Sequence, residues 1–216
     1  ATLSSHELAL GYKDVEDPSI TVRFELQDEK DTYFLVWTTT PWTLPSNLAL
    51  AVGNDIDYSY CKSGGQTLIV AEALREAVFR DIEHEVVKTV KGSKLVGIRY
   101  RQLFDYLSID ASNAFQVFAA DFVSTESGTG IVHTAPAYGV DDLALGQAND
   151  LPVVHGVGLD GHFVDEVEPV KGLFFKDADK PLIHILKERG MMFRSERYLH
   201  SYPFGWRTGD PILYYA

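Results

Sequence analysis

The sequence predicts an α+β, β-rich fold in which a curled sheet or β-barrel core carries short peripheral helices. Several short segments alternate apolar with polar residues or are rich in β-branched and aromatic residues, as strands are. A few segments have the spacing of about 3.6 residues that is typical of an amphipathic helix. Strands and helices follow one another irregularly, which favours this class over a parallel sheet built from repeated strand–helix units.

Most of the predicted strands lie in the first half of the chain. An alternating pattern predicts the first strand, through Ile20, Val22, Phe24 and Leu26. The runs 33–39 and 48–52 predict two more strands, because they are rich in apolar, β-branched and aromatic residues. The segment Ser-Gly-Gly-Gln at 63–66 predicts a hairpin turn between strands at 58–62 and 67–71.

Three helices are predicted from apolar spacing and end signals. The segment 72–82 carries an apolar stripe, and 141–149 is compatible with a short helix. The segment 180–189 has Pro181 in its first turn and is followed by Gly190, which are start and stop signals.

Extended segments at 115–123, 130–134 and 191–200 complete the predicted elements. No repeat, low-complexity tract or long Gly/Ser linker divides the sequence. We therefore expect residues 1–216 to form a single domain.

The composition limits the classes of function. The chain has 216 residues, of which 45% are apolar and 23% charged, as in a globular protein. Nineteen Lys and Arg against 31 Asp and Glu give a net charge of −12. A domain that binds nucleic acid alone by neutralising phosphates should be basic, so any nucleic acid must be delivered by another part of the machinery.

The cysteine count and hydropathy indicate a cytoplasmic protein. The single cysteine, Cys61, excludes an internal disulfide and suits a reducing cytosol. No apolar run approaches the roughly 18–20 residues of a membrane span, so no membrane partner is expected. The sequence also lacks the basic and then apolar start of a signal peptide.

The common catalytic and metal motifs are absent. There is no G-x-S-x-G elbow, Walker loop or dinucleotide-binding glycine motif. The segment Gly128-Thr129-Gly130 is a fragment of a glycine loop, and a tight turn leading into a strand is its favoured interpretation. The histidines are scattered, including His155 and His162, and a Cys-based zinc site would lack its thiolates. We therefore expect no metal and no cofactor.

One segment, 37–47, offers more hydrogen-bonding groups than packing requires. Thr38, Thr39 and Thr40 end a predicted strand and meet Pro41, and Pro45 follows shortly after. The prolines restrict the backbone, so the chain must leave the sheet along a stiff path with hydroxyl groups at its rim. The alternative is that threonine is simply a good strand residue and that the neighbouring tryptophan belongs to the core. Both interpretations stay open on physical grounds.

A second segment, 128–142, places a histidine and two carboxylates around a loop. His133 ends a predicted strand, and Asp141 and Asp142 lie at a predicted helix start. Either acid is a candidate N-cap, although two adjacent acids cannot both fill the same cap. A histidine, a carboxylate and a threonine-rich rim could bind a cationic amine together with a sugar or ester group.

Over nearly its whole length the sequence resembles the editing (CP1) domain of isoleucyl-tRNA synthetases, an insertion in a class I catalytic domain. The resemblance rests on four segments: 12–20, 38–47, 128–142 and 200–207. The second is the most specific. The related valyl and leucyl enzymes have an arginine in place of Thr40 and an acid in place of Trp42, so T-T-T-P-W-T indicates the isoleucyl branch.

The sequence also departs from the family pattern. Gly205 stands before Trp206, where the family often has a cysteine. The class I signatures H-I-G-H and K-M-S-K-S are absent, so we expect no aminoacylation by this chain. The resemblance implies an excised insertion in which 1–18 and 200–216 are the strands that connect to a larger synthetase.

The resemblance implies hydrolysis of valine wrongly esterified to isoleucine tRNA, and of valyl-adenylate, with cognate isoleucine excluded. Isoleucine differs from valine by one methylene, which a hydrophobic pocket distinguishes by only about 1–3 kcal/mol, a general magnitude for which this synthetase is a standard illustration. The expected partners are the charged 3′ end of the tRNA, valyl-adenylate and the catalytic body of the parent enzyme. We expect the chain to be a monomer.

The resemblance also implies roles for individual residues. Asp142 would bind the substrate ammonium, and His133 would line the side-chain pocket. The threonine rim would bind the amino acid and position water, through Thr38, Thr39, Thr40 and Thr43. The residues expected to take part in catalysis would be Asp142, Thr39, Thr40 and His133. Trp42 and Asn47 would shape the pocket and contact the terminal adenosine.

Three alternatives stay open at this point. The chain could be a β-rich module that binds an aminoacyl or nucleotide ligand without chemistry. It could be a metal-dependent hydrolase, although the sequence offers no credible set of ligands. His133 could be a general base and not a pocket wall, since the unperturbed pKa of histidine, about 6.5, suits that task.

Overall fold

The computed structural model describes residues 2–216, so Ala1 of the predicted leading segment 1–18 lies outside the described part. Within residues 2–216, the strands form one six-stranded sheet and one three-stranded sheet. The predicted α+β, β-rich class is confirmed. Of the two predicted core types, the curled sheet is found, because neither sheet closes into a barrel within the described residues.

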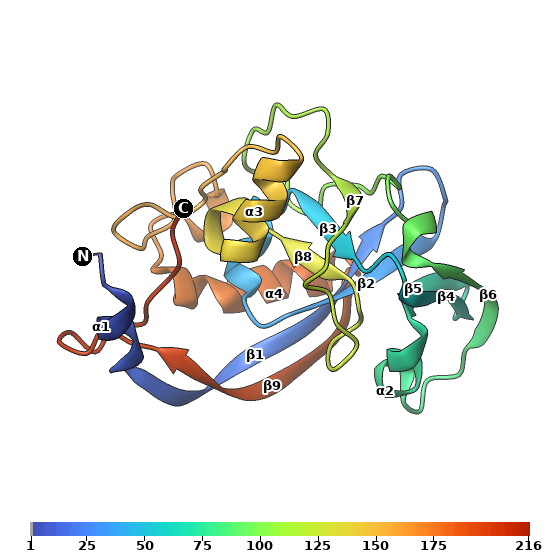
Figure 1. Cartoon of the computed structure of the whole chain (residues 1–216), viewed down its shortest axis with the longest axis horizontal. Coiled ribbons are helices and arrows are strands. Elements are labelled where there is room, and N and C mark those ends of the chain that lie inside the picture. Colours follow the sequence, from blue (N-terminus) through green and yellow to red (C-terminus); the bar gives the residue numbers. More distant parts are fainter. Residues whose placement is uncertain (1) are drawn as a thin grey trace.

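The larger sheet is built on a long ribbon. In spatial order its strands are β6 (Glu85–Lys91), β4 (Asp57–Ser63), β5 (Gln66–Ala71), β2 (Thr32–Thr38), β1 (Tyr12–Glu25) and β9 (Met192–Pro203). β1 and β9 form a curved antiparallel ribbon along one side of the molecule (Figure 1). Tyr12 pairs with Pro203, so the leading and trailing segments lie side by side. β2 pairs antiparallel with β1 and parallel with β5.

The sequence predictions for this sheet are largely confirmed. Strands are found in the segments 20–26, 33–39 and 191–200, and the hairpin between 58–62 and 67–71 is present. β6 was not predicted. Most of its side chains are exposed, so the strand has no alternating apolar face to reveal it.

The smaller sheet brings distant segments together. β3 (Ala49–Val52) lies between β7 (Gln116–Ala119), to which it is parallel, and β8 (Val132–Thr134), to which it is antiparallel. The predicted strands at 115–123 and 130–134 are therefore real but shorter than expected. In this sheet His133 lies opposite Leu50.

The helices are short and peripheral, as predicted. They are α1 (Ser5–Ala9), α2 (Arg75–Phe79), α3 (Val140–Ala148) and α4 (Asp179–Glu188). In the part of the chain that the structure describes, six 3₁₀ segments accompany them: η1 (Pro41–Ser46), η2 (Glu72–Leu74), η3 (Gly92–Lys94), η4 (Pro136–Tyr138), η5 (Glu168–Val170) and η6 (Phe175–Ala178). The predicted helix over 72–82 was wrong in extent. It begins as a 3₁₀ turn and stops at Arg80, whose φ of 50° is incompatible with a continuing helix.

The main hydrophobic core joins both sheets to α4. It contains fully buried residues from β1 and β2 (Phe24, Phe34), from β3 (Leu50) and from α4 (Leu182, Leu186). Because the same cluster contacts both sheets, it fixes the end of β2 relative to β3 and β8. This is the region where the candidate site forms.

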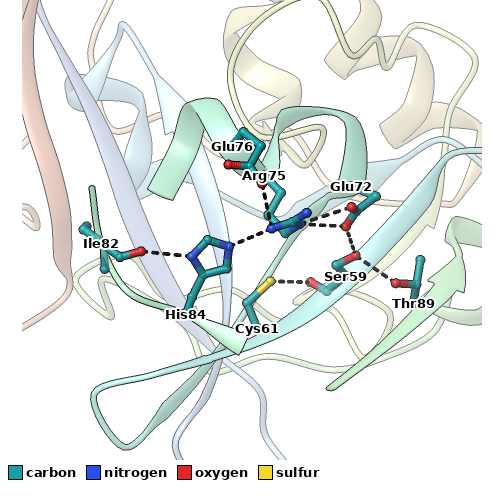
Figure 2. A network of polar contacts seen from close by, with 8 residues as sticks. All are labelled: Ser59, Cys61, Glu72, Arg75, Glu76, Ile82, His84 and Thr89. Atoms are coloured by element: carbon teal, nitrogen blue, oxygen red, sulfur yellow. Dashed lines mark hydrogen bonds and ion pairs between the residues drawn. The ribbon is translucent and has the colours of Figure 1, made fainter. Parts of the chain in front are cut away.

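A polar network stabilises the part of the molecule formed by β4, β5, β6 and α2 (Figure 2). Arg75 Nε donates to the carboxylate of Glu72 at 3.1 Å, and Arg75 Nη1 donates to His84 Nε2 at 2.9 Å. Ser59 is fully buried, and its hydroxyl bonds to Glu72 and to Thr89. The network thus provides hydrogen-bond partners for the buried Ser59 hydroxyl, because burying this group without partners would destabilise the fold.

The turn before β8 requires glycine for two separate reasons. Gly128 and Gly130 have φ of 74° and 77°, a region that other residues rarely adopt. A Cβ atom at Gly130 would also lie 2.4 Å from the Cβ of Ala71 on β5. The favoured interpretation of the glycine fragment, a tight turn leading into a strand, is therefore confirmed.

We predict that Gly130→Ala lowers the free energy of unfolding more than Gly64→Ala. Both positions have positive φ, which costs about 1–2 kcal/mol for alanine, but Gly64 is in open space. The clash with Ala71 adds about 1–3 kcal/mol at Gly130. Urea unfolding of the two variants measures the difference, and equal destabilisation would show that the packing against Ala71 is unimportant.

Candidate active site

A pocket of about 370 Å³ lies where the end of β2 faces β8 and the start of α3. Its lining residues come from β2 and the following turn (Trp37, Thr38, Thr39, Thr40), from η1 (Thr43), from the loop before β8 (Phe122, Ser124, Ser127, Gly128, Thr129, Gly130, Ile131), and from β8, η4 and α3 (Val132, His133, Ala135, Tyr138, Asp142). Six of the eight predicted site residues are therefore brought together in one pocket.

The threonines form a continuous rim of hydroxyl groups. Thr38 ends β2, and Pro41 starts η1, so the chain turns away from the sheet as the prolines predicted. The Oγ1 atoms of Thr38 and Thr40 are 3.3 Å apart, and those of Thr40 and Thr43 are 3.1 Å apart. The Thr43 hydroxyl also donates to the Thr40 carbonyl at 2.9 Å. The rim is therefore ordered by hydrogen bonds between its side chains, in addition to the preference of threonine for strands.

His133 forms a buried wall of the pocket. Only 8% of its surface is exposed. Its Nε2 lies 2.8 Å from Thr43 Oγ1, and its Nδ1 lies 2.8 Å from the Asn47 amide nitrogen. Burial lowers the pKa of His133 to about 4, because the charged imidazolium loses its hydration. The ring is therefore neutral at neutral pH.

Asp142 supplies the carboxylate of the pocket from the first turn of α3. Its Oδ2 accepts a hydrogen bond from the Ala135 backbone N–H at 2.8 Å. Burial raises the pKa of Asp142 to about 6, against the opposite effect of the Ala135 hydrogen bond, and the nearby charge of Asp141 raises it further. The carboxyl group is therefore mainly ionised at neutral pH.

Asp141, in contrast, is exposed and is not among the described residues that line the pocket. Its interpretation as a helix cap was wrong, because Gly139 occupies the N-cap position of α3. The two adjacent acids thus have different environments and form a natural pair for a controlled comparison.

Trp42 and Asn47 are buried and are not among the described residues that line the pocket; Asn47 contacts the pocket wall residue His133 from behind. The Trp42 backbone N–H donates to Asp179 Oδ1 at 3.0 Å, and its ring packs edge-on against Tyr138 and Phe175. Both residues therefore shape the pocket from behind, and their predicted contact with adenosine stays a prediction.

Several lining residues were not predicted from the sequence. Trp37 and Tyr138 belong to the two recognised segments, but no rule separates a lining aromatic residue from a core one. Phe122, Ser124 and Ser127 lie in an irregular loop, and no local sequence pattern predicts that this loop reaches the pocket.

The described residues offer neither a set of metal ligands nor a reactive cysteine at the pocket. Within residues 2–216, no group of three or more His, Cys, Asp or Glu is arranged to hold a metal, and independence from metal remains a prediction. Cys61 is fully buried on β4, and burial raises its pKa to about 11, so it is a poor nucleophile. None of the helices described is long and apolar enough to cross a membrane.

The pocket therefore combines one ionised carboxylate, one neutral imidazole wall and a row of hydroxyl groups. A carboxylate at a buried position favours an ammonium group through a charge-assisted hydrogen bond. Hydroxyl groups can hold a water molecule next to a bound ester or anhydride. The arrangement suits a small amino acid derivative with a free amine.

Comparison with known proteins identifies relatives along the whole chain. No family model matches. The isoleucine–tRNA ligase of Clostridium acetobutylicum is 50% identical over 213 residues, which are 99% of this chain and 20% of that protein. The isoleucine–tRNA ligase of Picrophilus torridus is 46% identical over 214 residues, with the same shares. The chain thus spans about a fifth of the length of these relatives.

Solved structures show the same fold at low identity. The CP1 structure of a leucyl-tRNA synthetase, GlLeuRS-CP1, matches with a TM-score of 0.68 and 14% identity over 82% of this chain and 99% of that one. The editing domain of the cytosolic leucyl-tRNA synthetase of P. falciparum matches with a TM-score of 0.59 and 9% identity, over 85% and 99%. The chain is therefore homologous, over its whole length, to a segment of isoleucine–tRNA ligases, and it has the fold of synthetase CP1 editing domains.

Proposed function

We propose that the chain is a hydrolytic editing domain of an isoleucyl-tRNA synthetase. It removes valine from isoleucine tRNA, hydrolyses valyl-adenylate and excludes isoleucine. The observation that carries the proposal is that Asp142 and the neutral, buried His133 line the same pocket as the threonine rim. The similarity to isoleucine–tRNA ligases supports the choice of amino acid.

The proposed mechanism uses position and electrostatics. Asp142 holds the substrate ammonium, and the aliphatic side chain points toward His133. Thr39 and Thr40 bind the amino acid and place a water molecule at the ester carbon. Hydrolysis then benefits from proximity and from fixed dipoles, without a protein nucleophile or a metal.

His133 is better suited to a steric role than to that of a general base. Both of its nitrogen atoms already lie within hydrogen-bond distance of protein groups, Thr43 and Asn47. Its pKa of about 4 also makes it a weak proton acceptor at neutral pH. The ring instead occupies volume that one more methylene would need.

The acidic character of the chain agrees with delivery of the substrate by a larger protein. The net charge of −12 disfavours a broad contact with tRNA. Only the single-stranded 3′ end need enter the pocket, while a catalytic body holds the rest of the tRNA. In this proposal the chain works in the cytosol, as a monomeric insertion whose ribbon β1–β9 leads to that body.

We predict that Asp142→Asn lowers kcat/KM for valyl-tRNA by roughly 30- to 1,000-fold, which corresponds to about 2–4 kcal/mol for a lost charged contact. The amide oxygen can still accept from Ala135, so the fold should persist. The matched control Asp141→Asn should stay close to the wild type, because Asp141 is exposed and outside the pocket lining. Deacylation assays with and without a chelator measure both effects. Near-normal turnover by a folded Asp142→Asn variant would refute the assignment.

We predict a bell-shaped dependence of kcat/KM on pH. Asp142 must be ionised, so activity falls as pH drops through about 6, its raised pKa. The substrate amine must be charged, so activity also falls as pH rises past about 8, the usual range of an α-amino group. His133 is neutral across this interval and adds no further limb. If the fall of kcat/KM at low pH is unchanged in Asp142→Asn, the titrating group is not Asp142.

We predict that His133→Ala gains activity on isoleucyl-tRNA while it still hydrolyses valyl-tRNA. Loss of the ring removes the volume that excludes the larger side chain, where overpacking costs about 1–3 kcal/mol. Parallel assays on both esters measure the change in discrimination. A folded variant that is inactive on both esters would instead favour the general-base alternative.

A further inference from the structure

We infer that Asn47 is a positioning residue that holds His133 as the neutral Nε2–H tautomer and so sets the direction of the threonine hydroxyls. The expected effect on catalysis rests on the proposed function, whereas the assignment of the His133 tautomer does not depend on it. It assigns Asn47 a role behind the pocket wall that does not require contact with substrate.

The first step is the orientation of the Asn47 amide. One end of the amide lies 3.0 Å from the Ala49 backbone carbonyl, which can only accept a hydrogen bond. That end must therefore be the NH2 group. The other end, the oxygen, accepts from the Tyr100 hydroxyl at 2.6 Å. Asn47 and Tyr100 are 4% and 2% exposed, so water does not compete for these contacts.

The second step is the position of the proton on His133. The same NH2 group lies 2.8 Å from His133 Nδ1, so Nδ1 must be the acceptor and carries no proton. The proton of the neutral ring is then on Nε2. It is donated to Thr43 Oγ1, 2.8 Å away. A single backbone carbonyl, that of Ala49, thus determines the tautomer of a side chain on another strand.

The His133 tautomer also sets the donor direction of the threonine hydroxyl groups along the rim. Thr43 Oγ1 accepts a hydrogen bond from His133 Nε2–H, and the Thr43 hydroxyl donates to the Thr40 carbonyl. Thr40 must then be the donor to Thr43 over 3.1 Å, and Thr38 the donor to Thr40 over 3.3 Å. The hydroxyl protons of Thr38, Thr40 and Thr43 therefore point along the rim. These three hydroxyl groups present oxygen lone pairs to the pocket and can accept from a bound water or ammonium group.

The consequence is a pocket with a single charged wall group. Its described lining contains three titratable side chains, Asp142, Tyr138 and His133. An imidazolium at His133 would place a second proton opposite the Asn47 NH2 group and a positive charge beside the substrate ammonium. The Asn47 contact disfavours that state, so the amine meets only the carboxylate.

The direct test is nitrogen-15 NMR of the histidine rings in the wild-type chain, with His133 assigned by its loss in His133→Gln. We expect a protonated Nε2 and an unprotonated Nδ1 from about pH 8 down to about pH 6. A protonated Nδ1 in this range, whether as the other tautomer or as imidazolium, would overturn the inference. The test needs no substrate, so it is independent of the proposed function.

The variant Asn47→Asp replaces the donor with an acceptor of the same shape. A carboxylate beside Nδ1 favours the imidazolium, so His133 should gain a proton at Nδ1 at about pH 7. We expect kcat/KM for valyl-tRNA to fall about tenfold or more at that pH, because like charges are then brought together. The loss should shrink as pH rises and the ring deprotonates, which simple structural damage would not produce.

Asn54→Asp is the matched control, since it makes the same charge change at an exposed turn. It should leave both the His133 spectrum and the turnover unchanged. An Asn47→Asp variant that folds and keeps the wild-type His133 tautomer would refute the role of Asn47. If the wild-type spectrum agrees with the inference but no ester is hydrolysed, the proposed function fails while the assigned tautomer stands.

Discussion

The hydrogen bonds of the buried Asn47 amide are the contacts on which the site depends most. Asn47 follows η1, which comes shortly after β2 of the larger sheet, and it lies two residues before the start of β3 in the smaller sheet. Its amide joins η1 to Tyr100, to the backbone of β3 and to His133 on β8. Because buried polar groups must find partners, these contacts fix how the two sheets meet at the pocket.

Burial has opposite effects on the two titratable groups that matter most. It raises the pKa of Asp142 to about 6 and lowers that of His133 to about 4. At neutral pH the carboxylate keeps its charge with help from the Ala135 N–H, whereas the imidazole stays neutral. In the proposed function, these charge states make the pocket selective for a cationic amine next to an apolar group of limited size.

The sequence predicted the fold class, most strands and the residues of the rim, because these depend on local patterns and on a recognisable motif. It did not predict β6, which lacks an apolar face, or the parallel pairing of β2 with β5. It also did not predict that Trp42 and Asn47 are buried outside the pocket lining. That placement depends on tertiary contacts, such as those with Asp179 and Tyr100, which no local pattern encodes.

The most direct test of the account is deacylation of valyl-charged and isoleucyl-charged isoleucine tRNA by the wild-type chain, each with and without a chelator. The account predicts hydrolysis of the valyl ester, little or none of the isoleucyl ester, and no effect of the chelator. Since the acidic chain should bind tRNA weakly, the assay requires high enzyme concentration. Binding of the valyl ester without hydrolysis, equal hydrolysis of both esters, or activity lost to the chelator and restored by zinc would contradict it.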